Sequence, residues 1–316
     1  FVAVMTRRTV LLFCVGAAFV YTLGFITGSL LFMDLNSNDN GFSRKVPLAS
    51  VQLKLAVLVF SSPENFQVRD AIRKTWLKSY FSDVVHYFVV GDGKLIGNIK
   101  NMLETEVSKH SDLLILNITD AYANLTTKLL HSFKWLSTNV RTDYVLKCDD
   151  DTYVRVDELR LELLNKPPGS LYWGFFDGRA HVKKSGDWQE NKWFLCDRYL
   201  PYALGGGYVV SMDIVDFISR NHAKLTGYNS EDVSLGVWTA ALNIKRLHDP
   251  RFNTESKSRG CSNRFLISHK LTIASIQDMH KNLVEEGNLC KFEYQARPSY
   301  EYNWNVPPSR CCVRND

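Results

Sequence analysis

The sequence lacks several patterns that would assign it to a common class at once. None of its seven cysteines forms a C-x-x-C pair, which argues against a structural zinc site. It contains neither G-x-G-x-x-G nor G-x-x-x-x-G-K, the glycine patterns of loops that hold nucleotide phosphates. Its net charge of +5 is modest and spread along the chain, so nucleic-acid binding is not expected. At 45% hydrophobic and 12% aromatic residues, the chain can nevertheless build a full core.

Charge is absent from one long stretch near the N-terminus. Residues 9–33 contain no charged side chain and exceed the about 20 residues needed to cross a bilayer. Arg7 and Arg8 precede this stretch and Asp34 follows it, so the positive-inside rule keeps the N-terminus cytosolic. A cleaved signal peptide is the alternative, although its apolar core usually spans only about 7–15 residues. We expect a type II membrane protein with a cytosolic tail (1–8), a transmembrane signal anchor (9–33), a stem (34–50) and a lumenal catalytic domain (51–316).

Glycosylation signals and cysteines fit a lumenal chain. Asn117 and Asn124 each open an N-x-Thr sequon, the acceptor of N-linked glycans. Besides Cys14 in the expected anchor there are six cysteines, most of which an oxidising lumen would pair, and their spacing does not choose among the pairings. Cys148 lies inside a predicted strand, so we expect a buried free thiol there. Five others remain, an odd number, and at least one more should be unpaired or intermolecular.

Apolar runs and amphipathic segments alternate over the first half of the predicted lumenal domain. Strands are predicted at 53–60, 84–91, 112–118 and 143–148, and helices at 63–76, 98–110 and 124–139. This order predicts an α/β fold with a mostly parallel, Rossmann-like sheet and helices on both faces. Ligands of such sheets bind beyond the carboxyl ends of the strands. The second half is less regular and richer in glycine turns and aromatic residues, as expected of an acceptor-binding part.

Three adjacent aspartates, Asp149, Asp150 and Asp151, follow the last of these strands. A solvated turn or a helix cap is the simpler interpretation, because Asp is common in both. A cap requires only one Asp, however, and three neighbouring carboxylates repel one another unless a positive group lies against them. Mg²⁺ or Mn²⁺ carrying a substrate phosphate would supply that group, since both ions prefer oxygen ligands. The pattern therefore predicts a metal-assisted phosphate site.

Two arginines and a run of glycines are further candidates for residues that bind a ligand. Arg69 and Arg73 lie four residues apart on a predicted helix, where they either clamp a phosphate or form a solvated face. The run LPYALGGGYVVS places three glycines before a strand-like segment. These glycines would let the backbone approach a sugar closely, with Tyr202 and Tyr208 as stacking faces; a plain tight turn is the alternative.

Acidic residues also open a later predicted helix. Glu231 and Asp232 follow Ser230, a plausible cap, and the helix dipole alone could account for both carboxylates. The functional interpretation is a general base, since a carboxylate can remove the proton of an attacking sugar hydroxyl. His248, in RLHDPRF, is either a structural residue or the imidazole ligand of a metal.

Seven sequence blocks, in order, resemble the β-1,3-galactosyltransferases of glycosyltransferase family 31. The blocks are RDAIRKTW (69–76), DAYANLTTK (120–128), YVLKCDDD, YWGFF, YALGGGYVVS, EDVSLG and HDPRFNTE, within about residues 53–312. The resemblance implies a GT-A type fold, UDP-galactose as donor, Mn²⁺ as cofactor and inversion at the anomeric carbon.

The resemblance also implies roles for individual residues. Asp151 and His248 would bind the metal, Asp232 would be the catalytic base, and Glu231 would contact the acceptor. Asp149 and Asp150 would support the metal and contact the ribose side of the uridine. The remaining residues assigned to the donor are Arg69, Arg73, Lys147, Gly205, Gly206 and Gly207.

The acceptor and the compartment are expected from the same resemblance. Galactose would pass in β-1,3 linkage to the galactosyl-xylose of a proteoglycan core protein, building the glycosaminoglycan linker, in a Golgi membrane that the N-terminal helix spans. Transfer of N-acetylglucosamine, or a glycoprotein or glycolipid acceptor, is the alternative within the family. A lumenal lectin or chaperone without activity is disfavoured, because the candidate metal and base residues are all present.

Overall fold

The computed structural model describes residues 52–314, apart from residues 80, 167, 187 and 192. The predicted cytosolic tail (1–8), membrane anchor (9–33) and stem (34–50) lie outside the described residues. Within the described part, no helix is both long and apolar enough to cross a membrane.

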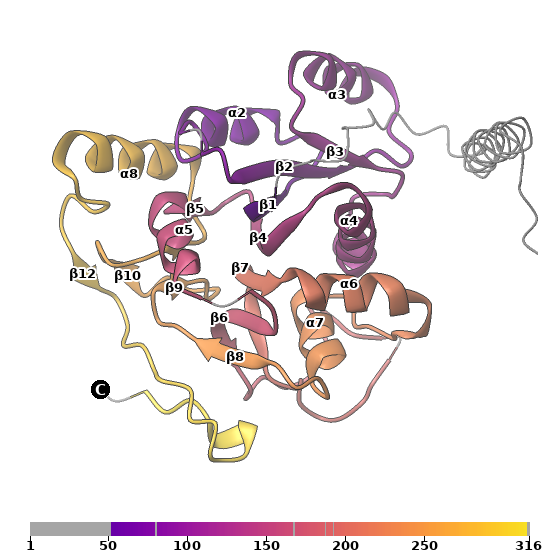
Figure 1. Cartoon of the computed structure of the whole chain (residues 1–316), viewed down its shortest axis with the longest axis vertical. Helices are drawn as coiled ribbons and strands as arrows, with labels where there is room; N and C mark the ends of the chain where they lie inside the picture. The colour runs from indigo at the N-terminus through magenta and orange to yellow at the C-terminus, as the bar shows by residue number, and fades with distance from the viewer. Residues whose placement is uncertain (1–51, 80, 167, 187, 192, 315–316) are drawn as a thin grey trace, which may run out of the picture. The chain divides into compact units, whose positions relative to one another are not determined.

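The core is a seven-stranded sheet whose central strands are apolar along most of their length (Figure 1). β1 (Leu53–Phe60) is buried from Leu55 onward, as expected of a strand covered on both faces. The strand order is β3-β2-β1-β4-β7-β6-β8. The other strands of this sheet are β2 (Val84–Gly91), β3 (Leu113–Leu116), β4 (Thr142–Asp149), β6 (Leu171–Asp177), β7 (Tyr202–Ser211) and β8 (Lys245–His248).

Most strand pairs in the sheet are parallel, which confirms the predicted mostly parallel α/β core. β1 runs parallel to β2 and β4, β2 to β3, and β6 to β8. β7 is the exception, because it runs antiparallel to both β4 and β6. The three glycines, which we expected to precede a strand, lie inside β7 itself.

Helices cover both faces of the sheet (Figure 1). α4 (Leu125–Asn139), α6 (Met212–Asn221) and α7 (Glu231–Thr239) pack together on one face, and α5 (Val156–Leu164) packs on the other. α4 confirms the helix predicted at 124–139, and its apolar stripe is buried at Leu129, Phe133 and Leu136. The remaining helices are α2 (Phe66–Lys74), α3 (Gly97–Lys109), α8 (Ile273–Glu286) and the 3₁₀ turns η1 (Tyr122–Asn124), η2 (His222–Lys224) and η3 (Pro308–Arg310).

Two small sheets complete the fold, and one of them joins the second half of the chain to the first. β11 (Ile267–Ser268) pairs with β5 (Tyr153–Val154) and with β9 (Phe252–Asn253). Because β5 follows the three aspartates, this pairing brings the residues after β11 back to them. β10 (Gly260–Cys261) pairs with β12 (Tyr294–Gln295) in the second small sheet.

The cysteines of the described region pair in part. Disulfides join Cys261 to Cys290 and Cys311 to Cys312. Cys148 is a buried free thiol, as predicted, and Cys196 is the additional unpaired cysteine that the odd number required.

Candidate active site

A cleft of about 460 Å³ opens where β1 and β4 end. Its size falls within the range of about 300–1,000 Å³ typical of small-ligand sites. Its walls include Ser61–Ser62, Asp149–Asp151, Gly205–Gly206, Glu231–Asp232 and His269–Lys270. The cleft therefore lies beyond the carboxyl ends of parallel strands, and it brings the aspartates together with the acidic start of α7.

Lys147 links these two acidic groups. Its ammonium donates to Asp149 Oδ1 at 2.8 Å, to the Gly205 carbonyl at 2.8 Å and to Glu231 Oε1 at 2.5 Å. Burial would lower the pKa of Lys147, but Asp149 and Glu231 outweigh it and raise that pKa. Lys147 also holds the pKa of Asp149 well below its usual range, against the effect of burial. The Glu231 carboxylate is committed to this ion pair and is only 4% exposed.

Asp150 is held by the loop that follows β1. Its Oδ2 accepts hydrogen bonds from Ser61 Oγ at 2.6 Å and from Asn65 Nδ2 at 2.9 Å. Burial raises the pKa of Asp150 in spite of these two donors. Asp150 thus fixes the wall formed by Ser61.

Asp151 faces His269, a residue that the sequence reasoning did not identify. His269 Nε2 lies 2.9 Å from Asp151 Oδ1 and 3.4 Å from Asp149 Oδ2. Burial would lower the pKa of His269, but these two carboxylates raise it to about 9. Asp151 Oδ1 and both ring nitrogens are buried, yet none of the three makes a hydrogen bond of ordinary geometry. Asp151 Oδ1 and His269 Nε2 still form a close ion pair, whereas His269 Nδ1 has no hydrogen-bond partner in the described part of the chain, and buried polar atoms of that kind are uncommon.

A metal ion would account for this arrangement. Ligand atoms of Asp149, Asp151 and His269 all lie within 4.8 Å of one another, so one cation could contact all three. Two carboxylates and an imidazole form a donor set that suits a divalent metal. Binding would displace the imidazole proton, because a metal ligand must be deprotonated.

His248 does not join this group. Burial lowers its pKa to about 4, so the ring is neutral. Nδ1 accepts a hydrogen bond from Phe176 N at 3.0 Å, and the proton on Nε2 faces the Tyr300 carbonyl at 2.9 Å. Both nitrogens are therefore committed to backbone partners, and His248 does not line the cleft. In the structure His269, and not His248, lies where it could bind a metal together with the aspartates.

Close packing of the glycine run explains how His269 reaches the aspartates. A Cβ atom on Gly206 would lie 2.5 Å from the His269 ring, and one on Gly205 would lie 3.1 Å from Asp232 Oδ2. Gly205 and Gly206 line the cleft, whereas Gly207 packs against the side chain of Ile267. These glycines thus let neighbouring functional side chains approach the backbone of β7.

The two tyrosines of the same strand have different positions. Tyr202 is 8% exposed and lines the cleft. Tyr208 is fully buried, where its ring packs edge-on against Tyr172, so it offers no face to a ligand.

Asp232 lies at the start of α7, where two backbone amides hold its carboxylate. Gly205 N donates to Oδ2 and Val233 N donates to Oδ1, each at 2.8 Å. Burial, and then the negative charge of Glu231, raise the pKa of Asp232 to about 7. A carboxylate poised near neutral pH in a cleft is suited to general-base catalysis.

Arg69 and Arg73 do not line the cleft. Arg69 is fully buried and pairs with Glu106, and Arg73 pairs with Glu106 and Asp112. The predicted nucleotide clamp is therefore an ion-pair network between α2, α3 and the start of β3. Arg69 still contributes indirectly to the shape of the cleft. It donates a hydrogen bond to Ser61 Oγ at 2.9 Å and so holds a residue of the cleft wall in place.

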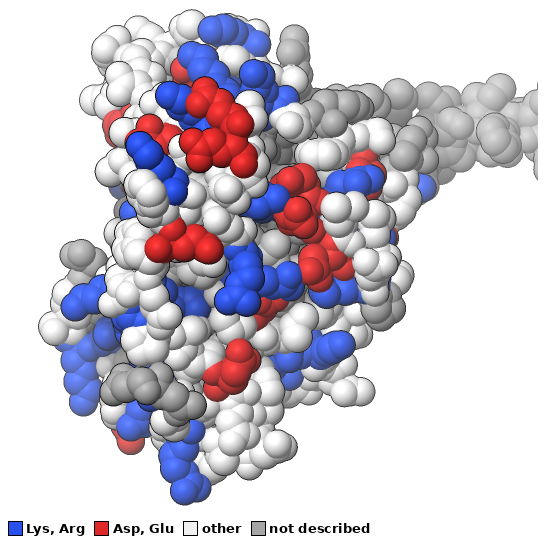
Figure 2. All heavy atoms as spheres, turned by 90° about the vertical axis from the view of Figure 1, so that its left-hand side faces the viewer, with Lys and Arg blue, Asp and Glu red and all other residues white. Residues whose placement is uncertain are grey.

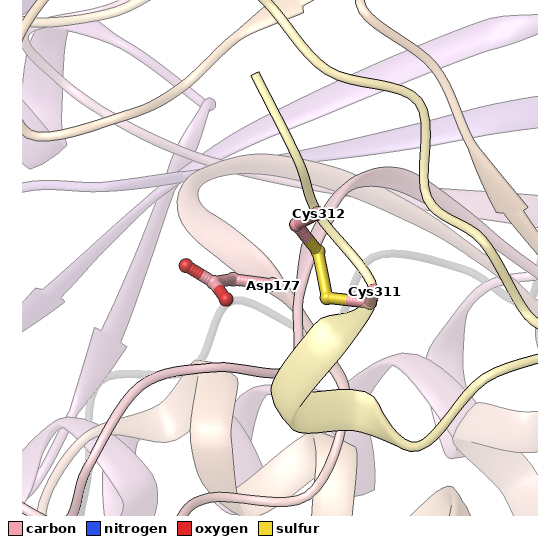
Figure 3. A group of neighbouring side chains, drawn as sticks. All are labelled: Asp177, Cys311 and Cys312. Carbon is pink, nitrogen blue, oxygen red and sulfur yellow. A yellow bond between two sulfur atoms is a disulfide. The ribbon is translucent and has the colours of Figure 1, made fainter. Parts of the chain in front are cut away.

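A second group of potential ligand atoms comprises Asp177, Cys311 and Cys312 (Figure 3). The two cysteines are joined in a disulfide, so their sulfurs are not thiolates and cannot serve as ordinary metal ligands. On the face drawn in Figure 2, acidic and basic side chains are interspersed, in keeping with the modest net charge.

Clustered carboxylates and Asp232, a half-buried carboxylate suited to act as a base, line the same cleft, as a group-transfer enzyme requires. Residues 67–250 match the galactosyltransferase family. Beta-1,3-galactosyltransferase 6 of Mus musculus is 47% identical over 270 residues, which cover 83% of this chain and 83% of that protein. The chain belongs to the galactosyltransferase family, which confirms the resemblance described above.

More distant relatives share part of the chain. UDP-GalNAc:beta-1,3-N-acetylgalactosaminyltransferase 2 of Xenopus laevis is 31% identical over 61% of this chain, which spans 39% of that longer protein. Among solved structures, the mannosyltransferase PcManGT from Pyrobaculum calidifontis, in complex with GDP-Man and Mn²⁺, matches 67% of this chain and 59% of that one. Its TM-score is 0.37 at 11% identity, too distant a likeness to bear on the fold.

Proposed function

We propose that the protein transfers galactose from UDP-galactose, with inversion, to the 3-hydroxyl of the terminal galactose of galactosyl-xylose on proteoglycan core proteins. The proposed fold is of the GT-A type. The observation that carries the proposal is the cleft in which the Asp149–Asp151 group and Asp232 meet. The relative at 47% identity, a beta-1,3-galactosyltransferase, supports the linkage and the donor.

Four residues of the cleft have a part in this reaction. Asp149, Asp151 and His269 would hold a divalent cation, for which we propose Mn²⁺. Such an ion, when bound, neutralises charge on the diphosphate of the leaving group. Asp232 removes the proton of the acceptor hydroxyl as its oxygen attacks the anomeric carbon and UDP departs from the opposite face. One displacement inverts the configuration, so no enzyme nucleophile is needed.

A matrix of donors and acceptors tests the proposal. Full-length protein is incubated with UDP-galactose or UDP-N-acetylgalactosamine and with β-linked galactosyl-xylose, N-acetylglucosamine or galactose acceptors, and the product linkage is determined by NMR. We expect UDP-galactose and galactosyl-xylose to give the highest kcat/KM and a β-1,3 product. A higher kcat/KM with UDP-N-acetylgalactosamine, or with an N-acetylglucosamine acceptor, would contradict the proposed specificity.

We also propose that the catalytic domain faces the Golgi lumen. The disulfide between Cys261 and Cys290 favours an oxidising compartment. Asn117 is exposed, whereas Asn124 is half-buried and donates to the Thr119 carbonyl at 2.8 Å, so Asn117 is the more accessible sequon.

Glycan analysis in cells tests this location. The full-length protein should co-localise with Golgi markers and should lose mass when N-glycosidase removes its glycans. Asn117→Gln should remove one such mass step. Cytosolic staining together with a mass that does not respond to the enzyme would contradict the proposal.

A further inference from the structure

One exposed tryptophan lines the cleft. Trp188 lies between β6 and β7, it lines the cleft, and 44% of it is exposed. No ring of the described residues packs against its indole. Two other aromatic residues of this segment are instead paired: Trp193 packs on Tyr228 with ring centres 4.8 Å apart, and Tyr199 packs edge-on against Tyr228. The Trp188 indole thus lines the cleft without packing against another aromatic ring of the described residues.

The segment that carries Trp188 is anchored to the start of α7. The Glu190 carboxylate is 2% exposed and accepts hydrogen bonds from Asn229 N at 3.0 and 2.9 Å. The Asn229 side chain in turn donates to the Gln189 carbonyl at 2.8 Å. Asn229 is three residues before Asp232, so these bonds tie the backbone beside Trp188 to the backbone that presents the base. They give Trp188 a defined position relative to Asp232.

The lining of the cleft combines two kinds of chemistry. Asp149, Asp151 and His269 are polar or charged, and they suit a metal and a diphosphate. Trp188 instead offers a flat apolar face. In a β-galactose ring the C–H groups at carbons 3, 4 and 5 lie on one face and form an apolar patch. The equatorial 3-hydroxyl projects from the ring edge, so stacking on an indole leaves it free to react.

We propose that Trp188 stacks on the terminal galactose of the acceptor and orients its 3-hydroxyl toward Asp232. This inference rests on the proposed function, because it takes the acceptor sugar from there. It assigns Trp188 to acceptor recognition and not to the donor. Pairs of aromatic rings contribute about 0.5–1.5 kcal/mol, and on the same scale removal of an indole that stacks on the sugar should raise the acceptor KM about 2- to 13-fold.

Kinetics of three full-length variants test the inference. Trp188→Ala should raise the acceptor KM by that factor, while the donor KM, and the slow hydrolysis of UDP-galactose without acceptor, stay within about twofold of the wild type. Trp188→Phe should recover most of the loss, since it restores an aromatic face. Phe194→Ala is the matched control, because Phe194 is an exposed aromatic residue of the same segment (57%) that does not line the cleft.

The outcomes separate this inference from the proposed function. An unchanged acceptor KM in Trp188→Ala, an equal rise in the donor KM, or the same loss in Phe194→Ala would overturn the role of Trp188. If the wild-type protein prefers another acceptor, the proposed function fails by itself. The Trp188 variants are then measured with that preferred acceptor, and the same criteria decide the stacking role.

Discussion

Asp232→Asn should lower kcat by about 10²–10⁴-fold, the usual effect of removing a general base, while UDP still binds. The asparagine amide is uncharged and cannot take the proton of the acceptor hydroxyl. Its carbonyl can still accept one of the two backbone hydrogen bonds that Gly205 and Val233 donate to Asp232. Steady-state kinetics and UDP titration calorimetry on the same preparation would separate turnover from binding.

The pH profile gives a second measure of the same residue. Asp232 must be deprotonated to act as a base, and its pKa is raised to about 7. In the wild type, kcat/KM should therefore rise with pH up to about 7 and level off above it, and Asp232→Asn should lose this limb. Asp213→Asn is the matched control, since Asp213 also accepts from a backbone amide, that of Ser170, but lies outside the cleft. A decrease in kcat of less than tenfold in Asp232→Asn would place the base elsewhere.

Removal of the metal, or of Asp151, should abolish transfer. EDTA should inactivate the wild type and Mn²⁺ should restore it, whereas Asp151→Ala should stay inactive at any ordinary Mn²⁺ concentration. Loss of a residue that only orients a metal ligand typically weakens metal binding by about 10- to 100-fold. His269→Ala should weaken Mn²⁺ binding by more than this, because it removes a proposed ligand itself. Binding is measured by titration of the ion alone, which does not depend on turnover.

The matched control for the metal is the other histidine. His248→Ala leaves Phe176 N without an acceptor and the Tyr300 carbonyl without a donor. We expect a loss of about 1–3 kcal/mol in the free energy of unfolding, with Mn²⁺ affinity unchanged. Tighter Mn²⁺ binding by His269→Ala than by His248→Ala would return the ligand role to His248. Full activity of Asp151→Ala in EDTA would exclude a metal altogether.

The alternation from β1 to β4 could be predicted from sequence because each element has a strong local signal. Strands buried on both faces are continuous apolar runs, as LKLAVLVF is, and α4 carries an apolar stripe at helical spacing. Their parallel order then places Asp149–Asp151 at a ligand-binding edge without any knowledge of contacts. The position of the cleft follows from these local patterns.

Other parts of the site depend on contacts between distant segments. His269 reaches Asp151 through β5 and β11, which are two residues each and too short to give a periodic signal. In ISHKL nothing distinguishes this histidine from a surface one. His248 matched a motif but is committed to backbone partners, and Arg69 is paired with Glu106 from another helix. Burial and partner choice of this kind are tertiary properties, so the pattern alone did not reveal them.

The absence of a side chain at Gly206 bears on the interpretation of missense variants of this chain. Even the smallest replacement, alanine, would put a methyl group 2.5 Å from the His269 ring, closer than Cβ atoms approach other atoms in proteins. Either the ring or β7 would have to move, and the ring is the part that faces Asp149 and Asp151. Gly206→Ala would thus disturb the proposed metal site although every proposed ligand residue is intact. A classification of variants that counts only changes of the proposed ligands would overlook it.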